Sequence, residues 1–277
     1  MHYIDPISQP EFPPPPFTPA QPPAAQGDPA KVDLLDVLLI VAVTIVASLL
    51  TSFAALAIYW LNHKNEHLTP EAVSKGLAGN ALYLVGLQLG AYLIIVGFMA
   101  LLTWGRHRVT LGKAISWKPP ATARQVWYAL AGGLALALIS DIGNVVLNRW
   151  IPKSLPFTEL FKDRPSALLL AGFGILIAPI VEEIAFRGFL YPALARFTGA
   201  LPSIFVTAAL FTLLHGAQLS FSWAPLLLIF IVGFTLTTVR ARTNSVALCV
   251  IVHMTYNFVL LAQTFIATHG FRQMQGV

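Results

Sequence analysis

Charged residues are scarce in this chain, and cysteine is almost absent. Only 10% of the 277 residues are charged and 56% are hydrophobic, whereas ordinary soluble domains carry roughly 25% charged residues. This composition excludes a typical soluble globular domain. Cys249 is the single cysteine, so neither an intrachain disulfide nor a cysteine-based metal cluster can form. We interpret Cys249 as a small apolar helix residue.

The chain also lacks a concentrated basic surface. Its formal net charge is +5, but the lysines and arginines, Arg240 included, are scattered among the loops and form no basic helix face or long run. The sequence therefore predicts no nucleic-acid partner. We interpret the positive charges as a topology signal, which favours a cytoplasmic amino terminus only slightly.

Long apolar runs are what the sequence does contain. A hydrocarbon core of about 30 Å requires about 20 apolar residues per helix. Runs of this kind occur at residues 34–61, 80–104, 126–147, 166–197, 201–217, 223–239 and 245–267. The sequence predicts an all-α fold, a polytopic integral membrane helix bundle with about seven transmembrane helices, or eight. We expect a multi-pass protein of a bacterial plasma membrane, surrounded by membrane lipids.

Proline content and loop length divide the chain into four parts. Residues 1–32 hold ten of the twenty prolines and predict a disordered tail. Residues 33–165 hold the first three helices and long loops. Residues 166–269 hold four helices with short loops, which favour antiparallel neighbours and make this part the predicted functional core. Residues 270–277 form a short tail.

Ionisable side chains inside the apolar runs are few. A carboxylate or guanidinium at the centre of a bilayer costs about 2.5–3.5 kcal/mol even on the lenient insertion scale, so each one calls for an explanation. The runs contain Asp141, Glu182, Glu183, Arg187, His215 and His253. All but Asp141 fall in the last four helices. For Asp141 we favour helix packing and leave a role in a substrate path open.

Helix geometry sorts the acids of the segment VEEIAFRGF. Glu183 and Arg187 are spaced i,i+4 with the acid first, the better order for an ion pair. Glu182 points about 100° away and has no local partner, which suits a carboxylate that meets water and substrate. Pro179 should kink the helix just before the acids, and the kink together with Gly188 would open room for water.

The next helices each add polar groups. Phe211 lies one turn before His215, and His253 shares a helix face with Asn257. Phe197, Leu201 and Thr243 mark the ends of the three predicted helices on one side of the membrane. At 1.5 Å per residue, Glu182, His215 and His253 lie ~22, ~21 and ~15 Å from these ends, respectively. One layer inside the bilayer can therefore hold all three. A base, two imidazoles and an amide are the parts of a hydrolytic centre.

These segments resemble a known family. EEIAFR, FTLLH and HMTYN match the EExxxR, FxxxH and HxxxN motifs of the CAAX protease and bacteriocin-processing (CPBP) family, also called the Abi domain, which includes type II CAAX prenyl endopeptidases. The resemblance covers about residues 166–267, in the family's order. It implies an intramembrane (metallo)endopeptidase whose substrate is a membrane-anchored or lipidated protein or peptide, cut in CAAX-type or leader-peptide processing.

The resemblance also implies roles for single residues. Glu182 would activate the attacking water, His215 would help to hold it, and His253 with Asn257 would stabilise the oxyanion. Glu183 and Arg187 would form the supporting ion pair.

Whether a metal takes part stays open at this point. Glu182, His215 and His253 would suit zinc with an open position for water, but the chain has no HExxH motif. Two other functions also stay open, a catalytically silent bacteriocin-immunity or scaffold protein and a proton-coupled transporter. The intact motif residues oppose the first, and the absence of a recognisable internal repeat opposes the second.

Overall fold

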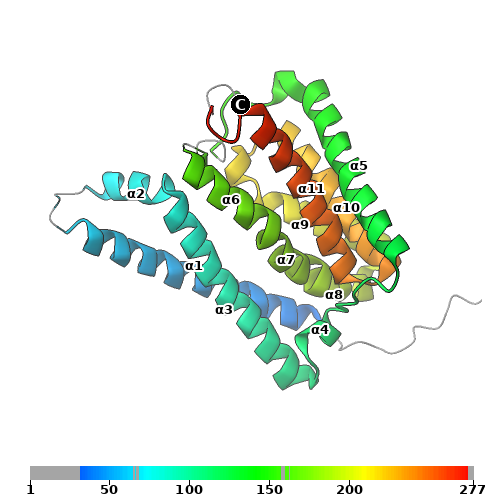
Figure 1. The fold of residues 1–277 in the computed structure, drawn as a ribbon. Helices are drawn as coiled ribbons and strands as arrows, with labels where there is room; N and C mark the ends of the chain where they lie inside the picture. Colours follow the sequence, from blue (N-terminus) through cyan, green and yellow to red (C-terminus); the bar gives the residue numbers. More distant parts are fainter. Residues whose placement is uncertain (1–31, 65, 67–68, 157–159, 162, 274–277) are drawn as a thin grey trace, which may run out of the picture.

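The structure, a computed structural model, describes residues 32–64, 66, 69–156, 160–161 and 163–273 (Figure 1). These residues form helices joined by loops, with no strand among them, so the predicted all-α fold is confirmed. The α-helices are α1 (Leu34–Asn62), α2 (Pro70–Ala78), α3 (Ala81–His107), α4 (Leu111–Ala114), α5 (Ala123–Leu147), α6 (Arg164–Leu176), α7 (Ala178–Glu183), α8 (Tyr191–Thr198), α9 (Ala200–Leu214), α10 (Trp223–Thr243) and α11 (Val246–Ala267). The described residues also include two short 3-10 helices, η1 (Asn148–Trp150) and η4 (Ala217–Leu219), and a π-helix, η3 (Ile184–Leu190).

The apolar segments have the dimensions of membrane spans. Within the described part of the chain, six segments are long and apolar enough to cross a bilayer: Leu34–Asn62, Ala81–His107, Ala123–Trp150, Arg164–Thr198, Trp223–Thr243 and Val246–Ala267. The fifth predicted run forms α9, which has only 15 residues. Large apolar side chains cover the exterior, with Leu93, Val145 and Ile266 exposed by 75%, 79% and 75%. Such a surface suits lipid and not water, and the chain is a multi-pass integral membrane protein.

The helices fall into an arm and a bundle. Figure 1 shows α1, α2 and α3 extending away from the remaining helices, while α6, α7 and α8 follow one another between the arm and the pair α10 and α11. The main helix contacts join α5 to α11, α9 to α10, and α1 to α3. The last four predicted spans therefore pack around one another, with α5 covering α11.

Helix starts follow from short polar caps at the ends of the apolar runs. Asp33 caps α1 and accepts a hydrogen bond from the backbone of Asp36, whose carboxylate accepts one from the Asp33 backbone in return. Arg106, in the last turn of α3, contacts both carboxylates, at 2.8 Å from Asp33 and 2.6 Å from Asp36. Burial alone would raise the pKa of Asp33, but the hydrogen bonds from Arg106 and the Asp36 backbone outweigh it and hold the pKa below its ordinary value. This cluster joins the start of α1 to the end of α3.

The two ends of the chain differ from each other. The predicted Pro-rich tail lies outside the described residues, apart from Val32, which is buried. At the other end Phe271, inside the segment predicted as a short tail, is 2% exposed and packs with Phe161. The bundle therefore extends a few residues beyond α11.

Candidate active site

The fourth predicted span is broken at its centre. Helix α6 ends at Leu176 and α7 begins at Ala178, so the interruption falls beside Pro179, whose ring nitrogen has no hydrogen to donate to the helix. After six residues α7 passes into the π-helix η3. Glu182 and Glu183 thus stand at the end of α7, and Arg187 lies inside η3. A π-helix is rare and often marks a functional site.

Gly188 allows this segment to pack closely against the turn that contains Ile115. A Cβ atom at this position would lie 2.9 Å from Ile115, which is 1% exposed in the turn after α4. Gly188 itself therefore leaves no room for water on this side, because the loop between α3 and α5 packs against it, and an opening produced by the Pro179 kink stays a prediction.

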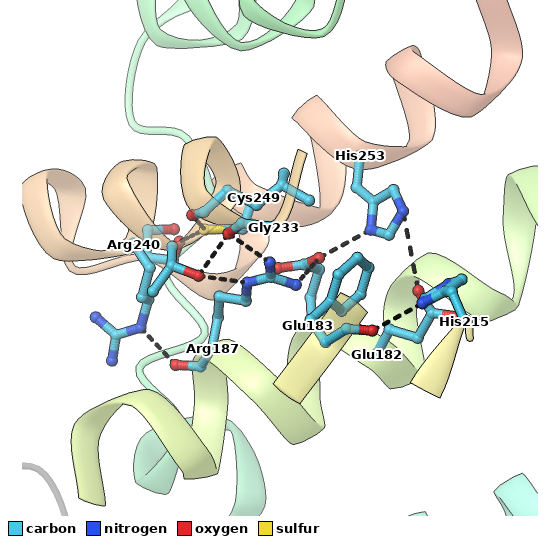
Figure 2. Close-up of polar contacts among 12 residues, drawn as sticks. Glu182, Glu183, Arg187, His215, Gly233, Arg240, Cys249 and His253 are labelled. Carbon is cyan, nitrogen blue, oxygen red and sulfur yellow. Dashed lines mark hydrogen bonds and ion pairs between the residues drawn. The ribbon is translucent and has the colours of Figure 1, made fainter. Parts of the chain in front are cut away.

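Glu183, Arg187 and His253 form a buried hydrogen-bonded group. Arg187 Nη1 and His253 Nδ1 both lie 2.8 Å from the same atom, Glu183 Oε1 (Figure 2). The Glu183 and Arg187 side chains are fully buried, and His253 is 4% exposed. A carboxylate can only accept, so Nδ1 of His253 donates to it, which fixes the orientation of the imidazole. Glu183 therefore pairs with Arg187, as its spacing predicts, and also orients His253, which the sequence did not indicate.

Glu182 faces the other nitrogen of the same imidazole. Its Oε2 lies 3.9 Å from His253 Nε2, beyond direct hydrogen-bond distance, and its side chain is 22% exposed. Figure 2 shows Glu182, His215 and His253 gathered at one end of the cluster, while Arg187 and Arg240 extend toward the other. The two adjacent acids thus lie in different surroundings, one sealed and ion-paired and the other accessible.

The ring of Phe211 lies between His215 and the buried group of Glu183, Arg187 and His253. It lies at the carboxyl end of α9, where its Nδ1 is 2.8 Å from the Phe211 carbonyl oxygen. Because a carbonyl only accepts, Nδ1 donates and Nε2 remains an acceptor when the ring is neutral. The Phe211 ring centroid lies 4.7 Å from that of His215, 6.1 Å from that of His253, and 4.7 Å from the Arg187 guanidinium. Phe211 is thus the packing element between both imidazoles and the arginine.

Asn257 lies one turn beyond His253 on α11 and reaches a different helix. Its Nδ2 donates to the Gly174 carbonyl of α6 at 2.7 Å. An amide nitrogen carries two hydrogens, so one donor remains after this bond. Asp141 lies apart from the site and accepts a hydrogen bond of 2.9 Å from Gln263, which joins α5 to α11 as the packing interpretation expects.

Helix α10 supplies contacts that the sequence analysis missed. Arg187 donates to the Gly233 carbonyl at 2.9 Å and to the Thr237 hydroxyl at 3.3 Å. Arg240, interpreted from the sequence as a loop charge, is in fact buried in α10 and donates from Nε to the Arg187 carbonyl at 2.9 Å. The i,i+4 spacing of Gly233 and Thr237, followed by Arg240, was the available signal. It was overlooked because none of these residues belongs to a motif.

The zinc site that the sequence left open would require Glu182, His215 and His253 to converge on one ion. Among the described residues, no group of three His, Cys, Asp or Glu side chains converges closely enough to hold a metal ion. The Nδ1 atoms of His253 and His215 are engaged by Glu183 and by a backbone carbonyl, which leaves only their Nε2 atoms as possible metal ligands. Zinc dependence stays a prediction, which a chelator titration with metal add-back would test.

Fold and site together define a multi-pass membrane protein with a buried carboxylate and imidazole centre. Residues 164–259 match the family of Rce1-like type II CAAX prenyl endopeptidases, and the resemblance predicted from the three motifs is thereby confirmed. The matched stretch contains Glu182, Glu183, Arg187, His215, His253 and Asn257. It indicates an intramembrane endopeptidase of the CAAX type in general. Neither the curated proteins nor the solved structures gave a match.

Proposed function

We propose that this protein hydrolyses a peptide bond of a membrane-anchored or lipidated protein, with Glu182 as the general base. The observation that carries this proposal is the placement of Glu182 Oε2 opposite His253 Nε2, 3.9 Å away, inside the stretch that matches the endopeptidase family. A partly exposed carboxylate beside an oriented imidazole is a suitable place to bind and activate water.

The reaction begins with water held between two acceptors. When the imidazole is neutral, His253 Nε2 and the Glu182 carboxylate both accept hydrogen bonds, so one water between them donates to both. Glu182 then takes a proton as the water oxygen attacks the scissile carbonyl carbon. His215 Nε2 is also an acceptor, so its proposed role is to take one of these two hydrogen bonds in place of His253 and not to add a third.

Collapse of the tetrahedral intermediate completes the hydrolysis. The oxyanion requires a donor where negative charge develops, and the remaining Asn257 N–H is the proposed donor, while neutral His253 accepts from the hydroxyl that the attacking water leaves on the carbon. Protonated Glu182 returns its proton to the leaving amine, which restores the carboxylate. Glu183 would hold the imidazole through its Nδ1 contact, so His253 Nε2 would keep facing the reacting groups throughout the reaction.

Replacement of Glu182 by glutamine is the direct test. The exchange keeps the size of the side chain and removes its basicity. Because general base catalysis contributes about 10²–10⁴-fold, we expect cleavage to fall by at least about 10²-fold. The assay uses the full chain in proteoliposomes and a fluorogenic peptide that ends in a prenylated cysteine and three further residues.

A matched control and a second readout complete the experiment. Glu71→Gln, which removes an exposed carboxylate paired with Lys75 on α2, should retain full activity. Quantitative proteomics of membranes with wild type or Glu182→Gln would identify a substrate of another sequence. Equal cleavage by wild type and Glu182→Gln, both of the peptide and of the membrane proteins, would refute the proposed protease activity. It would favour the scaffold or transporter alternatives.

A further inference from the structure

A second polar site lies on the far side of Arg187 from Glu183. A cavity of about 320 Å³ opens between the end of α8 and the end of α10. Its lining includes Tyr191, Ala195 and Arg196 from α8, and Arg240 and Asn244 from α10 and its carboxyl cap. None of the residues assigned to the hydrolytic centre lines this cavity.

Arg240 is the unusual residue of this cavity. Its side chain is 5% exposed, yet among the described residues no carboxylate forms an ion pair with it. Nε donates to the Arg187 carbonyl, and Nη1 donates to the side-chain oxygen of Asn244. An arginine keeps its charge in proteins, and burial of a charge without an opposite charge is costly. This guanidinium therefore calls for an anion that the described chain does not itself provide.

Two hydrogen-bond donors without a partner among the described residues belong to side chains that line the same cavity. In the described part of the chain, Arg240 Nη2 and the Tyr191 hydroxyl make no hydrogen bond, and neither is among the sealed unpartnered polar atoms. Both atoms thus remain accessible, and both residues line the cavity. Figure 2 shows the Arg240 guanidinium directed away from Glu183 and His253. An oxyanion in the cavity would receive hydrogen bonds from both groups.

The position of the cavity along the spans identifies the source of the anion. Helix α8 ends at Thr198 and α10 at Thr243, so the cavity lies where two membrane-spanning segments terminate. Arg196 stands in the last turn of α8 and Arg240 in the last turn of α10, and both line the cavity. Headgroup phosphates occupy this level of a bilayer, and basic pockets between transmembrane helices are suited to bind them. Arginine also matches the geometry of phosphate oxygens.

We propose that the cavity lined by Arg240, Tyr191 and Asn244 binds the phosphate of a membrane phospholipid. Arg240 Nη2 and the Tyr191 hydroxyl donate to the phosphate oxygens, while Asn244 holds the guanidinium through Nη1. The bond from Arg240 Nε to the Arg187 carbonyl anchors this lipid site to η3. The proposal concerns binding alone and does not depend on protease activity.

Binding of a short-chain phosphatidylglycerol to the purified full chain in detergent tests the site. Wild type should bind this lipid and should not bind the diacylglycerol with the same chains, which lacks the phosphate. Arg240→Gln should weaken binding about tenfold or more, because a hydrogen bond to a charged group is lost. Arg242→Gln removes an exposed arginine two residues away that does not line the cavity, and it should bind like wild type.

Tyr191→Phe keeps the ring and removes the hydroxyl alone, so it tests the site even if Arg240→Gln does not fold. We expect binding several-fold weaker and an unchanged melting temperature without lipid. Three results would overturn the proposal: equal losses in Arg240→Gln and Arg242→Gln, no loss in Tyr191→Phe, or binding of the diacylglycerol as tight as that of the phospholipid. Inorganic phosphate that binds as tightly as the lipid would show a site for the free ion and would overturn the lipid assignment.

Discussion

Glu183 connects three helices through a single oxygen atom. Oε1 accepts from Arg187 in η3 and from His253 in α11, and Arg187 in turn donates to Gly233 and Thr237 in α10. Removal of the carboxylate would leave a guanidinium buried without an opposite charge. The stability of the protein and the orientation of His253 therefore depend on the same residue.

Glu183→Ala should lower the free energy of unfolding by about 3–5 kcal/mol, the usual effect of removing one partner of a buried ion pair. Thermal unfolding in detergent, followed by tryptophan fluorescence, measures the change. Glu182→Ala is the matched control, because its carboxylate is partly exposed and makes no direct hydrogen bond among the described residues. A melting temperature lowered equally by both substitutions would contradict the separate roles assigned to the two acids.

Contacts between residues close in sequence could be predicted, whereas contacts between residues far apart in sequence could not. The contact between Glu183 and Arg187 follows from i,i+4 spacing, because a helix brings such residues together wherever it lies. The bond between Glu183 and His253 joins residues 70 positions apart. No rule based on neighbouring residues predicts a contact over that separation. The sequence therefore suggested a role for His253 but not its hydrogen-bond partner. Arg240 was assigned to a loop because the apolar run ends at residue 239, whereas α10 continues to Thr243.

At the scale of helices, glycines set how closely neighbours approach. A Cβ atom at Gly133 of α5 would lie 2.6 Å from both the Val252 carbonyl oxygen and the Thr255 Cβ atom of α11. At the adjacent Gly132 the nearest atom would be the Val252 Cγ2 atom, 3.9 Å away, an ordinary contact. Small residues at such crossings allow close van der Waals packing within a membrane.

Gly133→Ala should destabilise the protein by about 1–3 kcal/mol, the range for inserting an atom into a packed interface. Gly132→Ala should be neutral or slightly stabilising, because alanine favours the helix more than glycine does. Melting temperatures of both variants in the same detergent provide the comparison. If Gly133→Ala were as stable as Gly132→Ala, the close crossing of α5 and α11 would be wrong.

The whole molecule depends on helices outside the family match. Helix α5 precedes residues 164–259, yet Ala129, Leu136 and Ala137 of α5 share a buried cluster with Val252 and Tyr256 of α11. The loop before α5 reaches the start of α11 as well. The Ser245 hydroxyl donates to the Lys118 carbonyl at 2.6 Å, and the Val246 backbone donates to that of Ser116 at 3.2 Å.

A fragment of residues 164–277 should therefore insert into membranes but fail to form a stable, active bundle. Co-expression with residues 1–163 should restore activity, because the missing face of α11 would be covered again. Size-exclusion chromatography and the proteoliposome assay measure both outcomes. A monodisperse and active fragment on its own would show that α5 and the preceding loop are dispensable.

The sequence by itself determined that this is an all-α membrane protein and which residues are its candidate catalytic groups. Hydropathy, cap residues and the i,i+4 rule act within one helix, and the three motifs indicate without any coordinates the family that residues 164–259 match. Only the tertiary structure decided that Glu183 orients His253, that a π-helix carries Arg187, and that Arg240 is buried beside a cavity. These features arise where different helices meet, because side-chain partners far apart in sequence are selected by packing and not by spacing along the chain.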